Sequence, residues 1–208
     1  MDSSTEYMKD IETCIANFYK KDDEVYLNVA ALAQIGGPEV IERLLTLLYE
    51  EDLDIQYLAV NTLAQIEDNQ SALAGLFAAI HDPQLKARNG SLVEALEGFD
   101  VSDHFVDILK LYLNGGLKAA AMAKLLLDYT EFNISSRTLK KAKKHVHHFV
   151  HNSLKDDRYE TKMIEVTCHK HPVNFVNLLF LQSRHLTILQ SVLWNFNGTY
   201  APNRYHAQ

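Results

Sequence analysis

Three segments of this sequence share one apolar register at a spacing of 32 residues. They read PEVIERLLTLLYEE from residue 38, NQSALAGLFAAIHD from residue 69 and VSDHFVDILKLYLN from residue 101. Apolar residues recurring every three to four positions predict amphipathic helices, and a fixed internal period of this size indicates stacked supersecondary units. The aligned apolar columns are Ile41/Leu73/Phe105, Leu44/Leu76/Ile108, Leu45/Phe77/Leu109 and Leu48/Ile80/Tyr112.

A second set of helical segments lies between the first. DDEVYLNVAALAQI (22–35) and LDIQYLAVNTLAQI (53–66) match at an offset of 31 residues, and both end in Leu-Ala-Gln-Ile. Looser copies occupy residues 83–99 and 116–130. We therefore expect two antiparallel helices per repeat, which bury their apolar faces only by stacking on neighbouring repeats.

Residues 22–48 show the pattern of a HEAT repeat, with Gly36, Gly37 and Pro38 as the turn between helices and Asp82-Pro83 as a second turn of that kind. The pattern resembles most closely the short HEAT-like variant of the phycobilisome lyases, over about residues 22–130. The resemblance implies an all-α superhelix, or solenoid, of armadillo type. It does not imply one activity, because such chains include scaffolds, inhibitors, lyase subunits, hydroxylases and DNA glycosylases.

The predicted fold is thus an all-α solenoid of about six HEAT-like helix pairs, forming a single domain over residues 1–208. Clear acidic repeats are expected at 1–130, divergent basic and His-rich repeats at 131–197, and a tail at 198–208. Helices are expected at 4–19, 136–154, 157–170, 172–183 and 185–197, besides those of the central repeats.

The sequence favours a cytoplasmic protein. The N-terminus is acidic and polar without an apolar core, unlike a signal peptide. No run of about 18 apolar residues is present. Cys14 and Cys168 are isolated cysteines in segments predicted to be helical, a pattern typical of reduced thiols.

Charge is distributed unequally along the chain. Residues 1–109 contain 21 Asp or Glu against 6 Lys or Arg, whereas residues 110–208 contain 6 acidic against 14 basic residues and eight of the ten histidines. The acidic half either keeps its helices soluble or steers a basic partner toward the repeats.

The partner-binding face is predicted from the helical wheel of residues 22–35. Val25, Val29, Leu32 and Ala33 share one side, which leaves the opposite side of this helix and its counterpart in the next repeat to line a concave surface. The residues expected there are Glu24, Leu27, Ala31, Gln34, Asp54, Leu58, Thr62 and Gln65. The recurrence of Leu27 and Leu58 in register marks them as candidate contact residues.

Two clusters suggest other chemistry. His147 and His151 stand four residues apart on one helix face, but zinc needs further ligands, so no metal is predicted. The iron-binding His-Glu pairs of HEAT-like deoxyhypusine hydroxylases are missing from this sequence. Lys140, Lys141, Lys143 and Lys144 form a basic patch that is a candidate anion site.

The sequence hypothesis is a non-catalytic, cofactor-free protein-binding module: a small cytoplasmic inhibitor or immunity-type protein that masks a basic partner. One alternative is a lyase or chaperone accessory subunit acting on a protein–cofactor complex. Another is a nucleic-acid-binding enzyme of the HEAT-like DNA glycosylase type, against which the acidic and neutral inner helices argue. No membrane partner is expected.

Overall fold

A computed structural model describes residues 3–20 and 24–152, and over these residues the chain is all-α, without strands, as predicted. The helices expected at 157–170, 172–183 and 185–197, together with Cys168 and the tail, lie outside the described residues. The described elements are α1 (Ser3–Phe18), α2 (Val25–Ile35), α3 (Gly37–Leu47), α4 (Leu53–Gln65), η1 (Gln70–Ala72), α5 (Leu73–His81), α6 (Gly90–Glu94), η2 (Ala95–Gly98), α7 (Phe105–Asn114), α8 (Leu117–Tyr129) and α9 (Ser136–Asn152).

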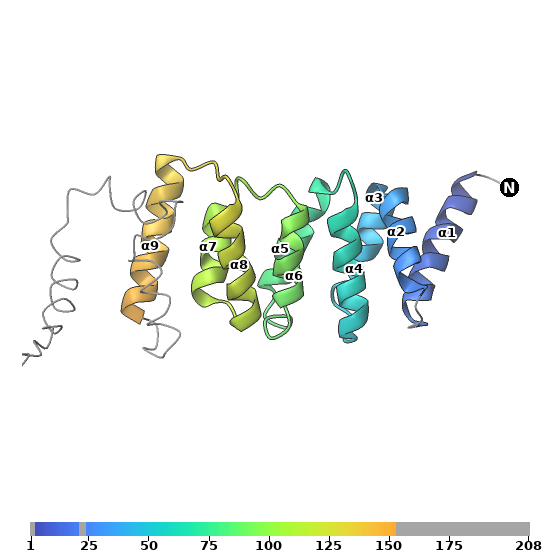
Figure 1. The fold of residues 1–208 in the computed structure, drawn as a ribbon, viewed down its shortest axis with the longest axis horizontal. Helices are drawn as coiled ribbons and strands as arrows, with labels where there is room; N and C mark the ends of the chain where they lie inside the picture. The colour runs from blue at the N-terminus through green and yellow to red at the C-terminus, as the bar shows by residue number, and fades with distance from the viewer. Residues whose placement is uncertain (1–2, 21–23, 153–208) are drawn as a thin grey trace, which may run out of the picture. The chain divides into compact units, whose positions relative to one another are not determined.

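The chain divides into two compact units, Met1–Thr138 and Leu139–Gln208. In the first unit consecutive helices pack as pairs: α1 with α2, α3 with α4, α5 with α6 and α7 with α8. The second members of these pairs also pack on one another in chain order, α2 on α4, α4 on α6 and η2, and α6 on α8 (Figure 1). We call α2, α4, α6–η2 and α8 row B, and their pair mates α1, α3, η1–α5 and α7 row A.

The apolar columns predicted from the repeat form the core of this unit. Leu44, Leu76 and Ile108 are completely buried, and the columns that begin at Ile41 and Leu48 are buried throughout. Only Leu45 in the remaining column is half-buried. Each repeat therefore presents the same face of its row A helix to the core, because that helix meets equivalent neighbours at each period.

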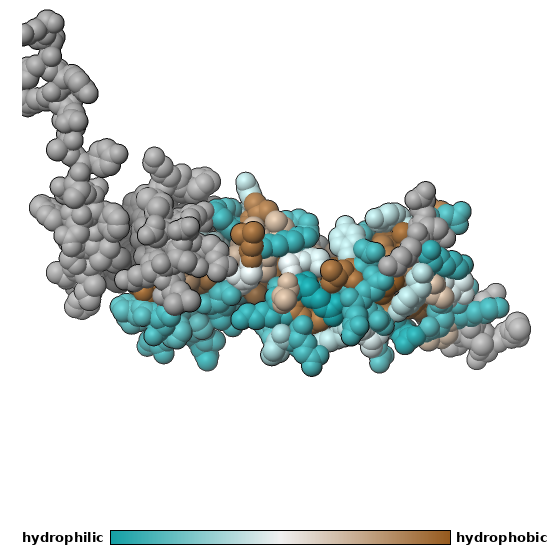
Figure 2. Space-filling model, turned by 90° about the horizontal axis from the view of Figure 1, so that it is seen from below, coloured by the Kyte–Doolittle hydropathy of each residue, from teal (hydrophilic) through white to brown (hydrophobic). Residues whose placement is uncertain are grey.

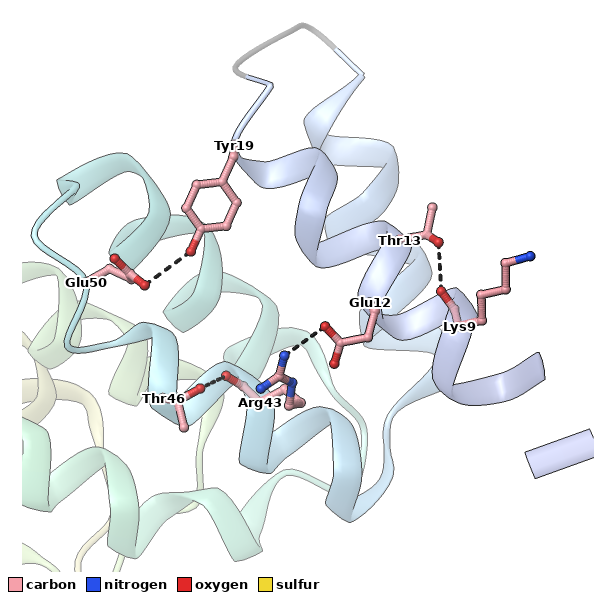
Figure 3. Close-up of polar contacts among 7 residues, drawn as sticks. All are labelled: Lys9, Glu12, Thr13, Tyr19, Arg43, Thr46 and Glu50. Atoms are coloured by element: carbon pink, nitrogen blue, oxygen red, sulfur yellow. Dashed lines mark hydrogen bonds and ion pairs between the residues drawn. The ribbon is translucent and has the colours of Figure 1, made fainter. Parts of the chain in front are cut away.

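Polar bonds between neighbouring repeats follow the same period. Figure 3 shows two of them: Arg43 Nη2 of α3 donates to Glu12 Oε2 of α1 at 2.8 Å, and the Tyr19 hydroxyl, just after α1, donates to Glu50 Oε1, just after α3, at 3.2 Å. Both join residues 31 positions apart. Further bonds of this class span 29–31 positions and join Tyr7 to Gly36, Asn69 to Gly98, Gln70 to Asp100 and Asn133 to Ser102 and Asp103.

Two buried carboxamides tie row B to the ends of row A helices. Gln56 of α4 donates to the Leu48 carbonyl oxygen at 2.7 Å, and Asn89, just before α6, donates to that of Ile80 at 2.9 Å. Leu48 and Ile80 are equivalent positions of one apolar column. These carbonyls stand at helix C-termini, where no intrahelical donor remains, so the side-chain amides satisfy groups that would otherwise be buried without a partner.

We expect Gln56→Met to lower the free energy of unfolding by about 1–2 kcal/mol, because it keeps the side-chain volume but leaves the Leu48 carbonyl without its donor. Gln65→Met is the matched control, since Gln65 ends the same helix and is exposed. That change should stay within about 0.5 kcal/mol. Urea unfolding followed by circular dichroism measures both, and equal midpoints would refute a structural role for the Gln56 amide.

The third repeat departs from the regular helix expected over residues 83–99. Residues 83–89 form turns, and only Gly90–Gly98 is helical. The Asp82 side chain accepts from the Gln84 amide at 2.8 Å, and Leu85 and Arg88 make bonds back to the third preceding carbonyl. This local bonding competes with the α-helical pattern, and Pro83 supplies no backbone donor to it.

The α9 helix begins at Ser136, where a helix was predicted, and is described through Asn152. Leu139, Ala142 and Phe149 of its predicted apolar face are buried, and Val146 and Val150 are half-buried. In the part of the chain that the structure describes, no helix has both the length and the apolar character needed to cross a membrane.

Candidate partner-binding surface

Row B carries most of the predicted contact residues at its surface. On α2, Glu24, Leu27 and Gln34 are exposed, and the Leu27 side chain keeps 69% of its surface accessible. On α4, Asp54 and Gln65 are exposed. Ala31, also expected outward, is half-buried.

Leu58 and Thr62 were predicted to be exposed on the concave surface, and this prediction is wrong. Leu58 is only 6% exposed and Thr62 is fully buried, with its hydroxyl donating to the Leu58 carbonyl oxygen at 2.7 Å. The reason is the position of α4 in row B. It packs on α2 on one flank and on α6–η2 on the other, whereas α2 packs on α4 on one flank. A position that is exposed to solvent on α2 is therefore buried at the equivalent place on α4.

The exposed residue that does recur is a tyrosine. Tyr26 of α2 is 60% exposed and its counterpart Tyr57 of α4, 31 positions later, is 43% exposed. The two tyrosines are paired in the sequence at the offset of 31 residues, one position before the leucines predicted as contact residues. The recurrence of an aromatic ring at an exposed position was the signal that would have identified them.

Tyr26 and Tyr57 stand near the turns that join row A to row B within each repeat, and more large side chains gather there. Figure 2 views the molecule from the side of these turns, and apolar patches appear among the hydrophilic surface of the described helices. We call this surface the turn edge and define it by its exposed large residues, Tyr19, Tyr26, Leu27, Tyr49, Leu53 and Tyr57, and by the carboxylates of Glu24, Glu50, Glu51, Asp52 and Asp54.

Bonds between the first three repeats hold the turn edge in place. Tyr19 donates to Glu50, and Arg88 of the third repeat donates to the backbone carbonyls of Glu50 and Tyr49. Partial burial, and then the charge and the hydrogen bond of Glu50, raise the pKa of Tyr19. Asp52 accepts from the Asp54 amide at 2.9 Å and caps α4. These contacts fix the turns that carry the exposed rings.

The opposite edge, made of the turns between repeats, has a different character. Its polar groups bond to one another: Asn69 Nδ2 donates to the Gly98 carbonyl at 2.8 Å, and Gln70 Nε2 donates to that of Asp100 at 2.8 Å. At the next turn along this edge, Asn133 Nδ2 donates back to Asp103 Oδ1, 30 residues earlier, at 3.0 Å. Both edges thus carry polar bonds between repeats, and the turn edge in addition gathers the exposed rings and the carboxylates that define it.

The histidine and lysine clusters of α9 lie on its surface. Lys140, Lys141 and Lys144 are exposed and Lys143 is half-buried. The imidazole rings of His147 and His151 stack with centroids 4.0 Å apart, and His151 Nδ1 lies 2.7 Å from the His147 carbonyl oxygen. Among the described residues, no group of three or more His, Cys, Asp or Glu is arranged to hold a metal ion.

A second ring cluster joins α5 to α7. Phe77 stacks on His104 at 4.6 Å between centroids and on His81 at 6.1 Å. Burial, and then the charge of Lys110, lower the pKa of His81. Burial raises the pKa of Asp107, but the hydrogen bond and charge of Lys110, aided by both histidines, bring it below its ordinary value. The cluster is explained by packing and charge pairing between adjacent row A helices.

The described geometry therefore assembles one surface suited to a macromolecular contact, the turn edge with the exposed stripe of row B. Aromatic rings are enriched at protein interfaces because they bury much area for little conformational entropy. Comparison with known protein families, with curated proteins and with solved structures finds no match to this chain.

Proposed function

We propose that this chain is a protein-binding module of the HEAT-like type, a superhelix of about six helix pairs, that masks a basic partner protein. Within that class we favour a small cytoplasmic inhibitor or immunity-type protein without catalytic activity. The observation that carries the proposal is the turn edge, where exposed tyrosines and leucines stand among carboxylates on turns fixed by bonds between repeats.

Two features support the superhelical architecture. Helices of row B pack in chain order, and polar bonds recur between residues about one repeat apart. A regular displacement from each repeat to the next is what generates a solenoid, and its surfaces are the usual binding sites of such proteins. Apart from α9, the further helices of the proposed array fall in residues 153–208, outside the described part.

Charge and apolar contact would act at different stages of binding. The acidic half of the chain attracts a basic partner over roughly 8–10 Å at physiological ionic strength and speeds the encounter. The rings and leucines of the turn edge then lose their water in the complex and slow dissociation. Such a division suits an inhibitor, which must capture its target quickly and hold it.

The exposed lysines of α9 favour one competing function, contact with nucleic acid as in the glycosylase alternative. A duplex-binding assay separates the two proposals. Binding to DNA with a steep salt dependence, lost when Lys140, Lys141 and Lys144 are reversed in charge, would favour the nucleic-acid function. No structural observation favours the lyase or chaperone alternative over masking.

The proposal predicts how a partner captured from cells should respond to mutation. Charge reversal at Glu24 and Asp54 should slow association several-fold at low salt, with the difference shrinking as salt rises, because the steering field is screened. Leu27→Ala should leave the association rate unchanged and speed dissociation about 5- to 10-fold if the leucine is buried in the contact. Surface plasmon resonance on the purified pair measures both rates.

Glu67→Lys is the matched control for charge reversal, since Glu67 is exposed in a turn between repeats, on the opposite edge. It should change association less than the same reversal at Glu24. If charge reversal at Glu24, Asp54 and Glu67 changes the association rate equally, the partner contacts this protein away from the turn edge and row B. A partner of acidic character would contradict the masking of a basic protein.

A further inference from the structure

The two edges of the first unit differ in the side chains that gather on them. Polar side chains of the turns between repeats are bonded to the neighbouring repeat, as shown by Asn69, Gln70 and Asn133. The turn edge instead exposes four tyrosine rings, Tyr19, Tyr26, Tyr49 and Tyr57, on the first two repeats. The other members of the turn edge are its five carboxylates, Glu24, Glu50, Glu51, Asp52 and Asp54. Rings beside carboxylates form an environment suited to an organic cation.

We propose that the turn edge binds an arginine-rich segment of the partner, with guanidinium groups lying on the tyrosine rings and paired with the neighbouring carboxylates. This inference rests on the proposed masking function and specifies the chemistry of the contact. Arginine is the cation indicated, because its planar group stacks on aromatic faces, is weakly hydrated and pairs with carboxylates through two parallel bonds. Lysine is a compact, strongly hydrated charge and gains less from a ring.

The repeat also specifies the spacing of the arginines. Tyr26 and Tyr57 occupy equivalent positions on α2 and α4, which pack directly on each other. Packed helices lie about 8–10 Å apart, so the two rings are offset by about that distance. A polyproline II segment rises about 3.1 Å per residue with three residues per turn, so residues i and i+3 share one side about 9 Å apart. Arginines three residues apart match the tyrosine pair.

A carboxylate stands at the start of each helix that carries a tyrosine of this pair. Glu24 precedes Tyr26 by two residues and Asp54 precedes Tyr57 by three, each at the start of its helix. Leu27 and Leu53 add exposed apolar surface next to them. A segment with arginines at every third position and apolar residues between them therefore finds charge, stacking and apolar contact together.

Fluorescence anisotropy with two labelled peptides tests the proposal on the full chain. One peptide repeats Arg-Pro-Pro four times, and the other repeats Lys-Pro-Pro four times, which keeps the charge and the polyproline II conformation. We expect the arginine peptide to bind about 10-fold more tightly than the lysine peptide at about 0.1 M salt. The double variant Tyr26→Leu/Tyr57→Leu should remove that preference, because leucine keeps the apolar contact but lacks the ring face.

Tyr129→Leu is the matched control, because Tyr129 is an exposed tyrosine at the end of α8, beside a turn of the opposite edge. It should retain the arginine preference, and circular dichroism should show equal folding of all variants. If both peptides bind equally, and the Tyr26→Leu/Tyr57→Leu variant binds them as the parent does, the arginine site is overturned. The proposed masking of a basic partner would stand. Failure of both peptides to bind even at low salt would overturn the arginine site together with the attraction of basic partners.

Discussion

Replacing Leu44 with aspartate should unfold the protein. Leu44 has no exposed surface, and the same holds for its counterparts Leu76 and Ile108 in the next two repeats. A carboxylate at this position would be buried among apolar side chains with no hydrogen-bond donor, or would have to be protonated at neutral pH. We expect a loss of at least about 4 kcal/mol, comparable to the entire stability of a marginal domain.

The comparison variants make this result interpretable. Ile108→Asp, two repeats along the same column, should have the same outcome, because the column is continuous. Ala78→Asp introduces the same group at an exposed position of α5 and should cost only about 1 kcal/mol or less, chiefly through helix propensity. Far-UV circular dichroism and urea unfolding distinguish the three. A folded Leu44→Asp protein with an unchanged midpoint would show that this column is not the core.

The core columns followed from the sequence because each helix pair packs in nearly the same environment as the pair before it. Each row A helix meets the same kind of neighbours one period later, so Leu44, Leu76 and Ile108 face the same burial and retain apolar character. A pattern in one dimension then suffices to locate the core. The polar bonds one period apart, such as Arg43 with Glu12, extend this regularity to the surface but needed side-chain geometry to be seen.

The exposed residues of row B were harder to predict, because exposure depends on how many sides of a helix are covered. Leu27 and Leu58 are equivalent in sequence, yet one is exposed and the other buried, since α4 has row B neighbours on both flanks. A helical wheel describes one helix and does not count its neighbours. Tyr26 and Tyr57 stay exposed in both repeats, so the side of the row B helix on which they lie is left open even where both flanks of the helix are covered.

The third repeat shows a different limit. Its row B segment was expected to be helical from residue 83, but local bonds from Asp82 and the missing donor of Pro83 favour turns until Asn89. Arg88 leaves the helical pattern to bond two carbonyls of the previous repeat. Competition between local turn chemistry and helix propagation is decided by such tertiary contacts, which a period analysis does not contain.

Gly98 of η2 lies close against α4, and we expect Gly98→Val to destabilise the chain by about 3 kcal/mol. A β-carbon at this position would lie 2.5 Å from the Ala64 carbonyl oxygen and 2.9 Å from Ala64 Cα. Both are backbone atoms of α4, so no side-chain rotation relieves the overlap and η2 must move away from α4. Forced separation of packed elements typically costs about 1–3 kcal/mol, and the branched side chain places valine at the upper end.

The same displacement would weaken a polar clamp. Asn69 Nδ2 donates to the Gly98 carbonyl at 2.8 Å and to the Leu63 carbonyl at 3.1 Å, so it joins the two elements that valine would push apart. Thermal unfolding should show a midpoint lower by about 6–12 °C, given the usual dependence for a chain of this size. Gly98→Ala, which adds only the first clashing carbon, should give a smaller shift in the same direction.

Gly116→Ser is the control for glycine replacement. A β-carbon at Gly116 would meet no atom within 4 Å, and the residue is the N-cap of α8 with ordinary dihedral angles. Serine favours this position because its hydroxyl accepts from a free backbone amide of the first turn, and it restricts the unfolded chain. We therefore expect a midpoint equal to or slightly above that of the parent protein. An unchanged midpoint for Gly98→Val would contradict this expectation, because α4 and η2 would then be further apart than the Ala64–Gly98 contact requires. The stacking of the second repeat on the third would in that case rest on the apolar columns without this backbone contact.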